Sequence, residues 1–382
     1  MKWSARGKSA IVGIGLAGIG AAPGFSHLDL TALAVHRALG DAGVSLKEVD
    51  GLFTANMVNM MATTAVTEYL GIRPVVQVGT NTGGNAFVDH LQWAALALDA
   101  GMCNVAVICY GSNQRTAGGA SMPPDQPFYD VPFNPREPIS SYALAAARHM
   151  YQYGTSREQL AEVAVSARRW AQLNPIAFAR EPLTIDDVLS SRMICDPLTL
   201  LDCCLVTDGA GAVVLMRAER SKDCRQMPVH VLGVASALTH RQISEMPDLT
   251  VTAAVESGAR AFELASLTPK DVDVVELYDA FTINVVLFLE DLGFCKKGEG
   301  GSFVANGRIA PGGSFPVNTN GGGLSCVHPG MYGIFTIIEA VEQLRGTAGD
   351  RQVPGAEIAL CHGNGGLLSN ESTALLGTPA TV

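Results

Sequence analysis

Short apolar runs alternate with helix-length amphipathic segments along most of the chain. Residues 30–43 carry apolar side chains at helical spacing, end at a glycine and lead to the strand-like run 49–54. Residues 251–265 repeat this arrangement and lead to the strand-like run 272–278. Such alternation is typical of parallel β-α units, so the sequence predicts an α/β fold.

Two glycine turns at similar offsets indicate an internal duplication. The segments 81–84 (Asn-Thr-Gly-Gly) and 319–322 (Thr-Asn-Gly-Gly) each precede a long apolar helix and then a strand, at 105–110 and 357–361. We therefore expect two related halves, 1–220 and 221–382, joined in the polar stretch 219–226 after the Asp-Gly-Ala-Gly-Ala segment 208–212.

A helical insertion at about 115–190 is expected within the first half. Its first part, 122–138, is rich in proline, and helix-like segments follow at 140–151 and 156–173. The second of these opens with Thr-Ser-Arg-Glu at 155–158, which fits a capping box.

Composition and charge narrow the classes of protein. Hydrophobic residues make up 48% of the chain and charged residues 16%, which suits strands buried on both faces. The formal charge is −10 and no basic run occurs, so nucleic acid and anionic membranes are poor partners. Nine cysteines without a C-x-x-C pair indicate free thiols in a reducing compartment, which predicts a cytoplasmic protein.

The N-terminus imitates a secretion signal, because three basic residues precede the apolar stretch 9–22. Glycines at 13, 15, 18 and 20 favour a different interpretation, in which 10–15 is a first strand that runs into a glycine loop. No apolar run is long enough to span a membrane.

Three glycine-rich segments of the second half carry the candidate chemistry. Each lies where a strand ends or a helix begins, which is the edge where open α/β sheets bind ligands. The glycines near the C-terminus leave backbone N–H groups that can face an oxyanion. The candidate residues are Tyr278 and Asp279, then Asn320 and His328, and finally Cys361, His362, Gly363 and Gly365.

Each candidate also has a structural interpretation. A strand-end tyrosine, a histidine before a proline and a cysteine in an apolar strand are all common in ordinary folds. No metal site is expected, because the cysteines and histidines lack zinc-ligand spacing. The segment 13–18 has Gly-x-Gly-x-x-Gly spacing but no acidic residue after the next strand, so no dinucleotide cofactor is expected.

Taken together, three motifs resemble the thiolases, and more closely the sterol-carrier-type branch and its lipid-transfer relatives. They are Tyr-Asp-Ala-Phe at 278–281, Asn-Thr-Asn-Gly-Gly at 318–322 with His-Pro-Gly at 328–330, and Cys-His-Gly-Asn-Gly at 361–365. The resemblance extends to 208–212 and 94–101 and so covers most of the chain.

The resemblance implies a thiolase fold of two related α-β-α-β-α halves, usually in a homodimer, with an acyl-coenzyme A substrate between the halves and the insertion. It implies that His328 polarises the thioester oxygen, that Cys361 transfers a proton and that the Gly365 N–H joins an oxyanion site. Coenzyme A enters as part of the substrate, and no separate cofactor is implied. Relatives of this type also often associate with a small zinc-ribbon and OB-fold protein.

The chain departs from the thiolase pattern in two places. Thr80 stands where thiolases carry the nucleophilic cysteine, and an alcohol needs a dedicated base to act as a nucleophile. Tyr278 stands where thiolases carry asparagine or, in the sterol-carrier-type branch, histidine. A phenol can donate a hydrogen bond, or act as a general base if its surroundings lower its pKa.

The departures favour a reaction without an acyl-enzyme. Lipid-transfer relatives that act as aldolases share the Tyr-Asp-Ala-Phe turn. We expect retro-aldol cleavage of a β-hydroxyacyl-CoA, in which Tyr278 takes the hydroxyl proton and Cys361 or His362 returns a proton to the α carbon. Two alternatives stay open: an acyl-CoA acyltransferase that uses Thr80 or Cys361 as acyl carrier, and a non-catalytic lipid-transfer subunit of the same fold.

Overall fold

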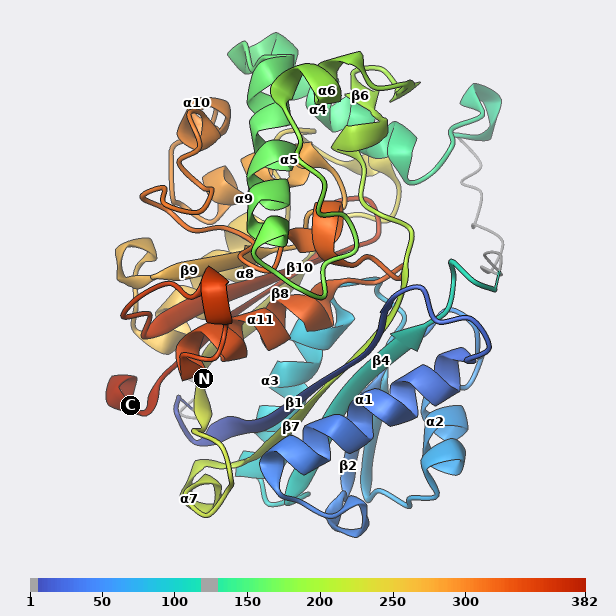
Figure 1. Cartoon of the computed structure of the whole chain (residues 1–382), viewed down its shortest axis with the longest axis vertical. Helices are drawn as coiled ribbons and strands as arrows, with labels where there is room; N and C mark the ends of the chain where they lie inside the picture. Colours follow the sequence, from blue (N-terminus) through green and yellow to red (C-terminus); the bar gives the residue numbers. More distant parts are fainter. Residues whose placement is uncertain (1–5, 118–129) are drawn as a thin grey trace.

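The computed structural model describes residues 6–117 and 130–382. Its main sheet has nine strands in the order β3-β2-β4-β7-β1-β8-β11-β10-β9 (Figure 1). The strands are β1 (Ser9–Gly20), β2 (Gly51–Thr54), β3 (Val76–Gly79), β4 (Val105–Ser112), β7 (Asp208–Arg217), β8 (Val229–Leu238), β9 (Val274–Leu277), β10 (Ile358–Gly365) and β11 (Asn370–Gly377). A small second sheet pairs β5 (Met193–Cys195) with β6 (Leu198–Thr199).

Helices cover both sides of this sheet and also fill the space between its two parts. They are α1 (His27–Ala42), α2 (Ala62–Leu70), α3 (Ala86–Asp99), α4 (Ile139–Tyr153), α5 (Arg157–Gln172), α6 (Ile185–Ser190), α7 (Ala218–Ser221), α8 (Ala254–Ala265), α9 (Thr282–Asp291), α10 (Gly300–Val304) and α11 (Gly333–Arg345).

The sheet divides at the short pairing of β1 with β8, which joins them only at Ala10 and Ile11. Helices α3 and α11 each pack on strands of both parts, so they form a shared central layer (Figure 1). Helix α1 covers the other face of β1, β4 and β7, and α8 covers β8 and β11. This arrangement of α-β-α-β-α layers confirms the predicted thiolase fold. One part of the sheet contains β1, β2, β3, β4 and β7, and the other contains β8, β9, β10 and β11, while the division into domains at residue 220 stays a prediction.

Glycines in the first strand of each part allow a helix to lie directly on the backbone. A Cβ on Gly15 of β1 would stand 2.3 Å from the Ala34 carbonyl oxygen of α1, and a Cβ on Gly233 of β8 would stand 2.5 Å from the Ala261 carbonyl oxygen of α8. In both halves, a glycine in the strand therefore lets the covering helix contact the strand backbone.

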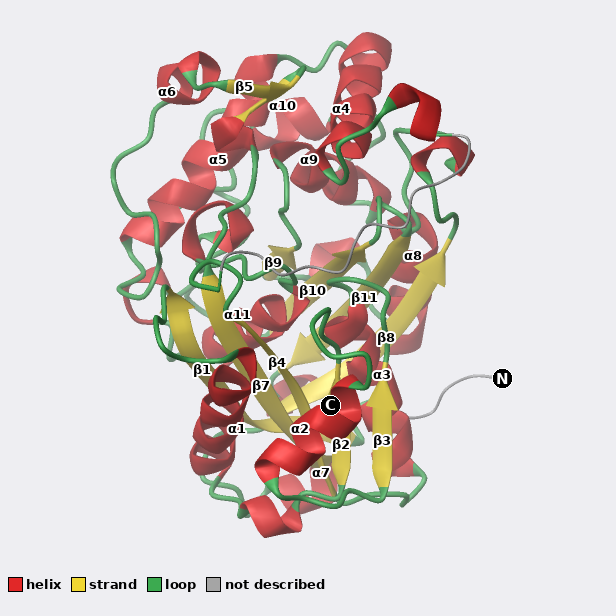
Figure 2. Cartoon of the chain, turned by 90° about the vertical axis from the view of Figure 1, so that its right-hand side faces the viewer, coloured by secondary structure: helices red, strands yellow, loops and turns green. Residues whose placement is uncertain are grey.

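The insertion forms a helical cap over the second part of the sheet, built from α4, α5 and α6 (Figure 2). A buried contact ties it to the core, because His149 Nε2 on α4 lies 3.0 Å from a Glu290 carboxylate oxygen on α9. Part of the proline-rich segment 122–138 lies outside the described residues.

Three local predictions need correction. Strand β1 runs to Gly20, so Gly18 and Gly20, which were expected in a glycine loop after residue 15, belong to the strand. The capping box of α5 is formed by Ser156 and Gln159, one residue later than expected. Strand β10 extends to Gly365, so the Cys361–Gly365 motif lies inside a strand. Among the described residues, no helix is long and apolar enough to cross a bilayer.

The close contact between Gly15 and α1 predicts that a methyl group at residue 15 destabilises the fold. Gly15→Ala should lower the free energy of unfolding by about 2 kcal/mol, because α1 must move off the strand. Gly40→Ala is the matched control, since Gly40 lies within α1 with no atom near its absent Cβ. Alanine there should raise stability by roughly 0.5–1 kcal/mol. Urea unfolding of both variants tests the pair, and an equal effect of the two would contradict the packing argument.

Candidate active site

A buried tyrosine and a buried histidine share a hydrogen bond where the two halves meet. Tyr278 directly follows β9, and its Oη lies 3.1 Å from Nε2 of His328 in the loop ahead of α11. Burial lowers the pKa of His328 to about 4, so the imidazole is neutral at physiological pH. Burial raises the pKa of Tyr278 well above its ordinary value. Both groups are therefore neutral, and in the tautomer with the proton on Nδ1 the phenol donates to His328 Nε2.

This result changes the role expected for Tyr278. Its surroundings raise the pKa of the phenol where a general base would need a lowered value. Tyr278 can accept a proton only if it passes its own to His328 at the same time. The pair, and not the tyrosine alone, is the candidate base.

The first half of the chain holds the His328 backbone in place. The His328 N–H donates to Thr207 Oγ1 at 3.0 Å, and its carbonyl accepts from Gln114 Nε2 at 2.9 Å. Tyr110 Oη donates to the Pro329 carbonyl oxygen. Sequence reasoning missed these supports, because they come from segments without a recognisable motif and lie about 120 or more residues away.

Glycine backbones from opposite halves touch next to Tyr278. A Cβ on Gly84 would stand 2.1 Å from Cε2 of the Tyr278 ring. A Cβ on Gly83 would stand 2.8 Å from the Gly365 Cα, and one on Gly363 would stand 2.8 Å from the Asn85 Cα. The turn at the start of α3 and the end of β10 thus pack without intervening side chains.

Thr80 does not join the Tyr278–His328 pair. Its hydroxyl lies 3.0 Å from Nε2 of His90, on α3 of the same half. His90 is fully buried, and burial lowers its pKa to about 3. Thr80 therefore has a histidine partner, but one that is a weak base.

Cys361 and His362 point to opposite faces of β10, as successive strand residues do. The Cys361 thiol is fully buried and lies 3.5 Å from the Thr336 carbonyl oxygen of α11. Burial raises its pKa well above the ordinary value, so the thiol keeps its proton.

His362 lies on the outer side of the sheet, where Nδ1 is 2.9 Å from Thr373 Oγ1 and the ring packs on Phe288 of α9 at 4.5 Å. It therefore cannot share with Cys361 the task of returning a proton to one substrate carbon. The alternative of His362 as proton donor stays a prediction, which this geometry disfavours.

Asp279 and Asn320 hold the loop that carries His328. Asp279 Oδ1 accepts from the Gly323 N–H at 2.5 Å, and burial raises the pKa of this carboxyl to about 7. Asn320 Oδ1 accepts from Tyr332 Oη at 2.9 Å and from the Gly322 N–H at 2.7 Å. In these contacts both residues act as loop anchors.

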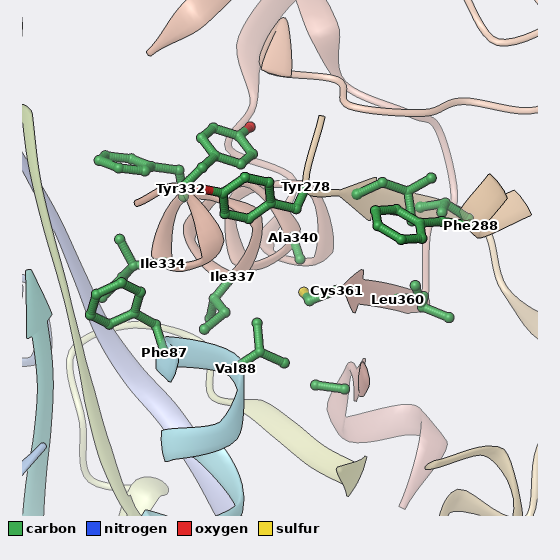
Figure 3. Packing of buried hydrophobic residues seen from close by; sticks show 14 of the residues in the cluster. Phe87, Val88, Tyr278, Phe288, Tyr332, Ile334, Ile337, Ala340, Leu360 and Cys361 are labelled. Atoms are coloured by element: carbon green, nitrogen blue, oxygen red, sulfur yellow. The ribbon is translucent and has the colours of Figure 1, made fainter. Parts of the chain in front are cut away.

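Tyr332 is a candidate that the sequence reasoning missed. Its ring meets that of Tyr278 edge-on at 5.7 Å and stacks on His328 at 6.4 Å. Figure 3 shows the two tyrosines side by side, with the Cys361 sulfur facing the helix that carries Ile337 and Ala340. The available signal was its position, as the last residue between the His-Pro-Gly turn and α11.

The described residues contain no group of three or more histidine, cysteine, aspartate or glutamate side chains placed to hold a metal ion. The arrangement instead offers a buried proton-transfer pair next to glycine backbones. Such an arrangement suits chemistry in which a proton leaves one atom while negative charge collects on another.

Comparison with known proteins identifies relatives of this chain. Residues 235–378 match the family of thiolase C-terminal domain-like proteins. An acetyl-CoA acetyltransferase of Methanothermobacter thermautotrophicus is 36% identical, covering 94% of this chain and 96% of the relative. The 17-hydroxy-3-oxo-4-pregnene-20-carboxyl-CoA lyase of Mycobacterium tuberculosis is 37% identical, covering 90% and 92%. The solved Ltp2-ChsH2(DUF35) aldolase superposes with a TM-score of 0.89 at 32% identity, covering 98% and 99% of the two chains.

The contact between Gly84 and Tyr278 can be tested directly. Gly84→Ala should displace the Tyr278 ring by about 1 Å or more, because a carbon at 2.1 Å must retreat to ordinary contact distance. A crystal structure of the variant should then show the Tyr278–His328 hydrogen bond broken. Gly40→Ala serves as control and should leave the pair in place. An undisturbed Tyr278 in the Gly84 variant would show that the loops do not position it.

Proposed function

The chain belongs to the thiolase superfamily, and from that premise we propose that it cleaves a β-hydroxyacyl-coenzyme A by retro-aldol chemistry. The observation that carries the proposal is the Tyr278–His328 hydrogen bond beside glycine backbones, in a chain with threonine at the position of the thiolase nucleophile. The lyase and aldolase names of two of the relatives support the same reaction class.

The proposed step begins at the β-hydroxyl group. Its proton passes to Tyr278 Oη as Tyr278 passes its own proton to His328 Nε2. The bond between the α and β carbons breaks, the β carbon becomes the carbonyl of a ketone or aldehyde, and the bonding electrons form the enolate of the shorter acyl-CoA. The Cys361 thiol then protonates the α carbon and becomes a thiolate. The proton held by His328 replaces the one that Cys361 gives up, which restores both groups for the next turnover.

The enolate oxygen needs hydrogen-bond donors, and glycine backbones are the candidates. We assign this role to the Gly363 and Gly365 region of β10 and to the turn at 83–84. The start of α3 is the positive end of the helix dipole, so it also favours an anion. Loss of one such donor costs roughly 3 kcal/mol of transition-state stabilisation.

Removing the Tyr278 hydroxyl gives the most direct kinetic test. Tyr278→Phe should lower kcat by roughly 100-fold or more, because the β-hydroxyl loses its proton acceptor. The assay follows release of carbonyl product from a series of β-hydroxyacyl-CoAs. Tyr69→Phe is the control, since Tyr69 is an exposed phenol on α2. Undiminished cleavage by the Tyr278 variant would remove the residue from this role.

Acyl transfer is the second candidate, and the Thr80–His90 contact is the observation that favours it. Because burial lowers the pKa of His90 to about 3, this histidine is poorly suited to activate an alcohol. We therefore expect no covalent intermediate at Thr80.

Mass spectrometry distinguishes acyl transfer from cleavage. After incubation with acyl-CoAs and acid quenching, the peptide that contains Thr80 should keep its unmodified mass, and so should the one that contains Cys361. A gain of one acyl group on either peptide, formed and lost at the rate of turnover, would establish the acyltransferase in place of the lyase.

We propose that two copies of the chain associate along β3. This strand lies at the open edge of the sheet, where backbone groups lack a neighbouring strand (Figure 2). Nearby, Met60 is 98% exposed, Met61 62% and Val75 79%. Covering this edge would bury apolar surface and complete the backbone hydrogen bonding.

A small partner protein is also proposed. The solved aldolase structure described above joins Ltp2 to a ChsH2(DUF35) component. We infer that a partner of the zinc-ribbon and OB-fold type binds this chain too, and that acyl-CoA is the substrate they handle. A cytoplasmic location stays a prediction from the nine free cysteines.

A further inference from the structure

Two buried carboxyl groups share one hydroxyl beneath the loop that carries His328. Glu276 of β9 and Glu339 of α11 are both buried, and so is Thr319. Thr319 Oγ1 lies 2.8 Å from Glu276 Oε1 and 2.7 Å from Glu339 Oε1. Both distances are those of full hydrogen bonds.

Counting protons on Thr319 limits the charge of this pair. A hydroxyl has one proton and two lone pairs, so it can donate to only one of the two carboxyl groups. One lone pair accepts from Gln343 Nε2 at 3.0 Å. If both carboxyl groups were ionised, the remaining short contact would join two acceptors. One carboxyl must therefore carry a proton and donate it to the second lone pair.

The neighbours decide which carboxyl is protonated. Glu339 accepts from Arg351 through both oxygens, at 3.1 Å and 2.9 Å, and this two-point ion pair keeps it ionised. Glu276 has no cation in hydrogen-bond contact among the described residues, and its Oε2 has no partner there. Burial and the nearby negative charge of Glu339 raise the pKa of Glu276 well above its ordinary value.

The protonated group lies directly behind the site. Thr319 also donates its N–H to Glu276 Oε1 at 3.2 Å, so Glu276 anchors the loop through two contacts. On one side of Thr319, Asn318 Oδ1 accepts from the Leu277 N–H at 2.6 Å, next to Tyr278. On the other side, Asn320 Oδ1 accepts from Tyr332 Oη. By holding Thr319, Glu276 therefore helps to position both Tyr278 and Tyr332.

We propose that Glu276 is a neutral carboxylic acid in the folded enzyme and a positioning residue for Tyr278 and Tyr332. Its effect on catalysis rests on the proposed lyase function, but its protonation does not. Because Glu276 pairs in register with Cys361, a neutral acid also keeps a fixed negative charge away from the strand where the enolate forms. The titratable or charged groups that face it are Glu339, Cys361, Asp279 and Tyr332, with Arg351 beyond Glu339.

Infrared spectroscopy of the resting enzyme tests the protonation. At neutral pH the wild type should show the carbonyl stretch of a protonated carboxyl that is missing from Glu276→Gln. Glu371→Gln is the matched control, because Glu371 is another fully buried carboxyl of raised pKa, outside this network; the band assigned to Glu276 should survive there. If Glu276→Gln keeps every protonated-carboxyl band of the wild type, the proposal is overturned, whatever the reaction proves to be.

A second variant covers the case in which Glu276→Gln does not fold. Thr319→Val removes the acceptor for the Glu276 proton, so the same band should move to higher frequency. An unchanged band in Thr319→Val would mean that the acid does not donate to this hydroxyl, and the proton count would fail.

Kinetics and stability test the positioning role. The amide in Glu276→Gln can donate to Thr319 as the neutral acid does, so this variant should keep about tenfold more of kcat than Glu276→Ala. A raised folded pKa means that the wild type loses stability relative to Glu276→Gln as pH rises from about 5 to about 8. Equal kcat loss in both variants, or an opposite trend with pH, would contradict the role.

Discussion

Backbone contact without side chains, between the turn at 80–86 and the end of β10, is the constraint on which the site depends. Gly84 leaves room for the Tyr278 ring, and Gly363 and Gly365 let β10 approach the start of α3. A side chain at any of these positions would force the two segments apart and disturb the hydrogen bond between Tyr278 and His328. The Tyr278–His328 distance is therefore set by packing between segments almost 200 residues or more apart in the sequence.

Burial gives these groups their chemical state. His328, His90 and His362 all have lowered pKa values, while Tyr278 and Cys361 have raised ones. Each of these groups is therefore neutral near physiological pH. A substrate that enters this site meets few fixed charges. The negative charge that develops on the enolate is therefore the largest change of charge during the reaction. Preorganised donors have the greatest effect in such surroundings.

Much of this arrangement could be predicted from local sequence, because helices, strands and glycine turns have short-range signals. The α/β fold was predicted in this way, and so were the candidates Tyr278, His328 and Cys361, whose catalytic roles stay predictions. The face on which His362 points could not be predicted, because it depends on β10 extending to Gly365 and on the strand alternation that follows. The Thr80–His90 contact and the supports from Tyr110, Gln114 and Thr207 could not be predicted either, since they depend on how strands, helices and loops approach one another in space.

The central claim is that Tyr278 and His328 act together on a β-hydroxyl group held between the two glycine-lined segments. A crystal structure of the Tyr278→Phe variant with a bound β-hydroxyacyl-CoA tests it most directly. The claim predicts the β-hydroxyl at the space vacated by Tyr278 Oη, near His328, with the thioester oxygen facing the glycine backbones at 83–84 and 363–365. A thioester bound elsewhere, or a β-hydroxyl turned away from His328, would contradict it.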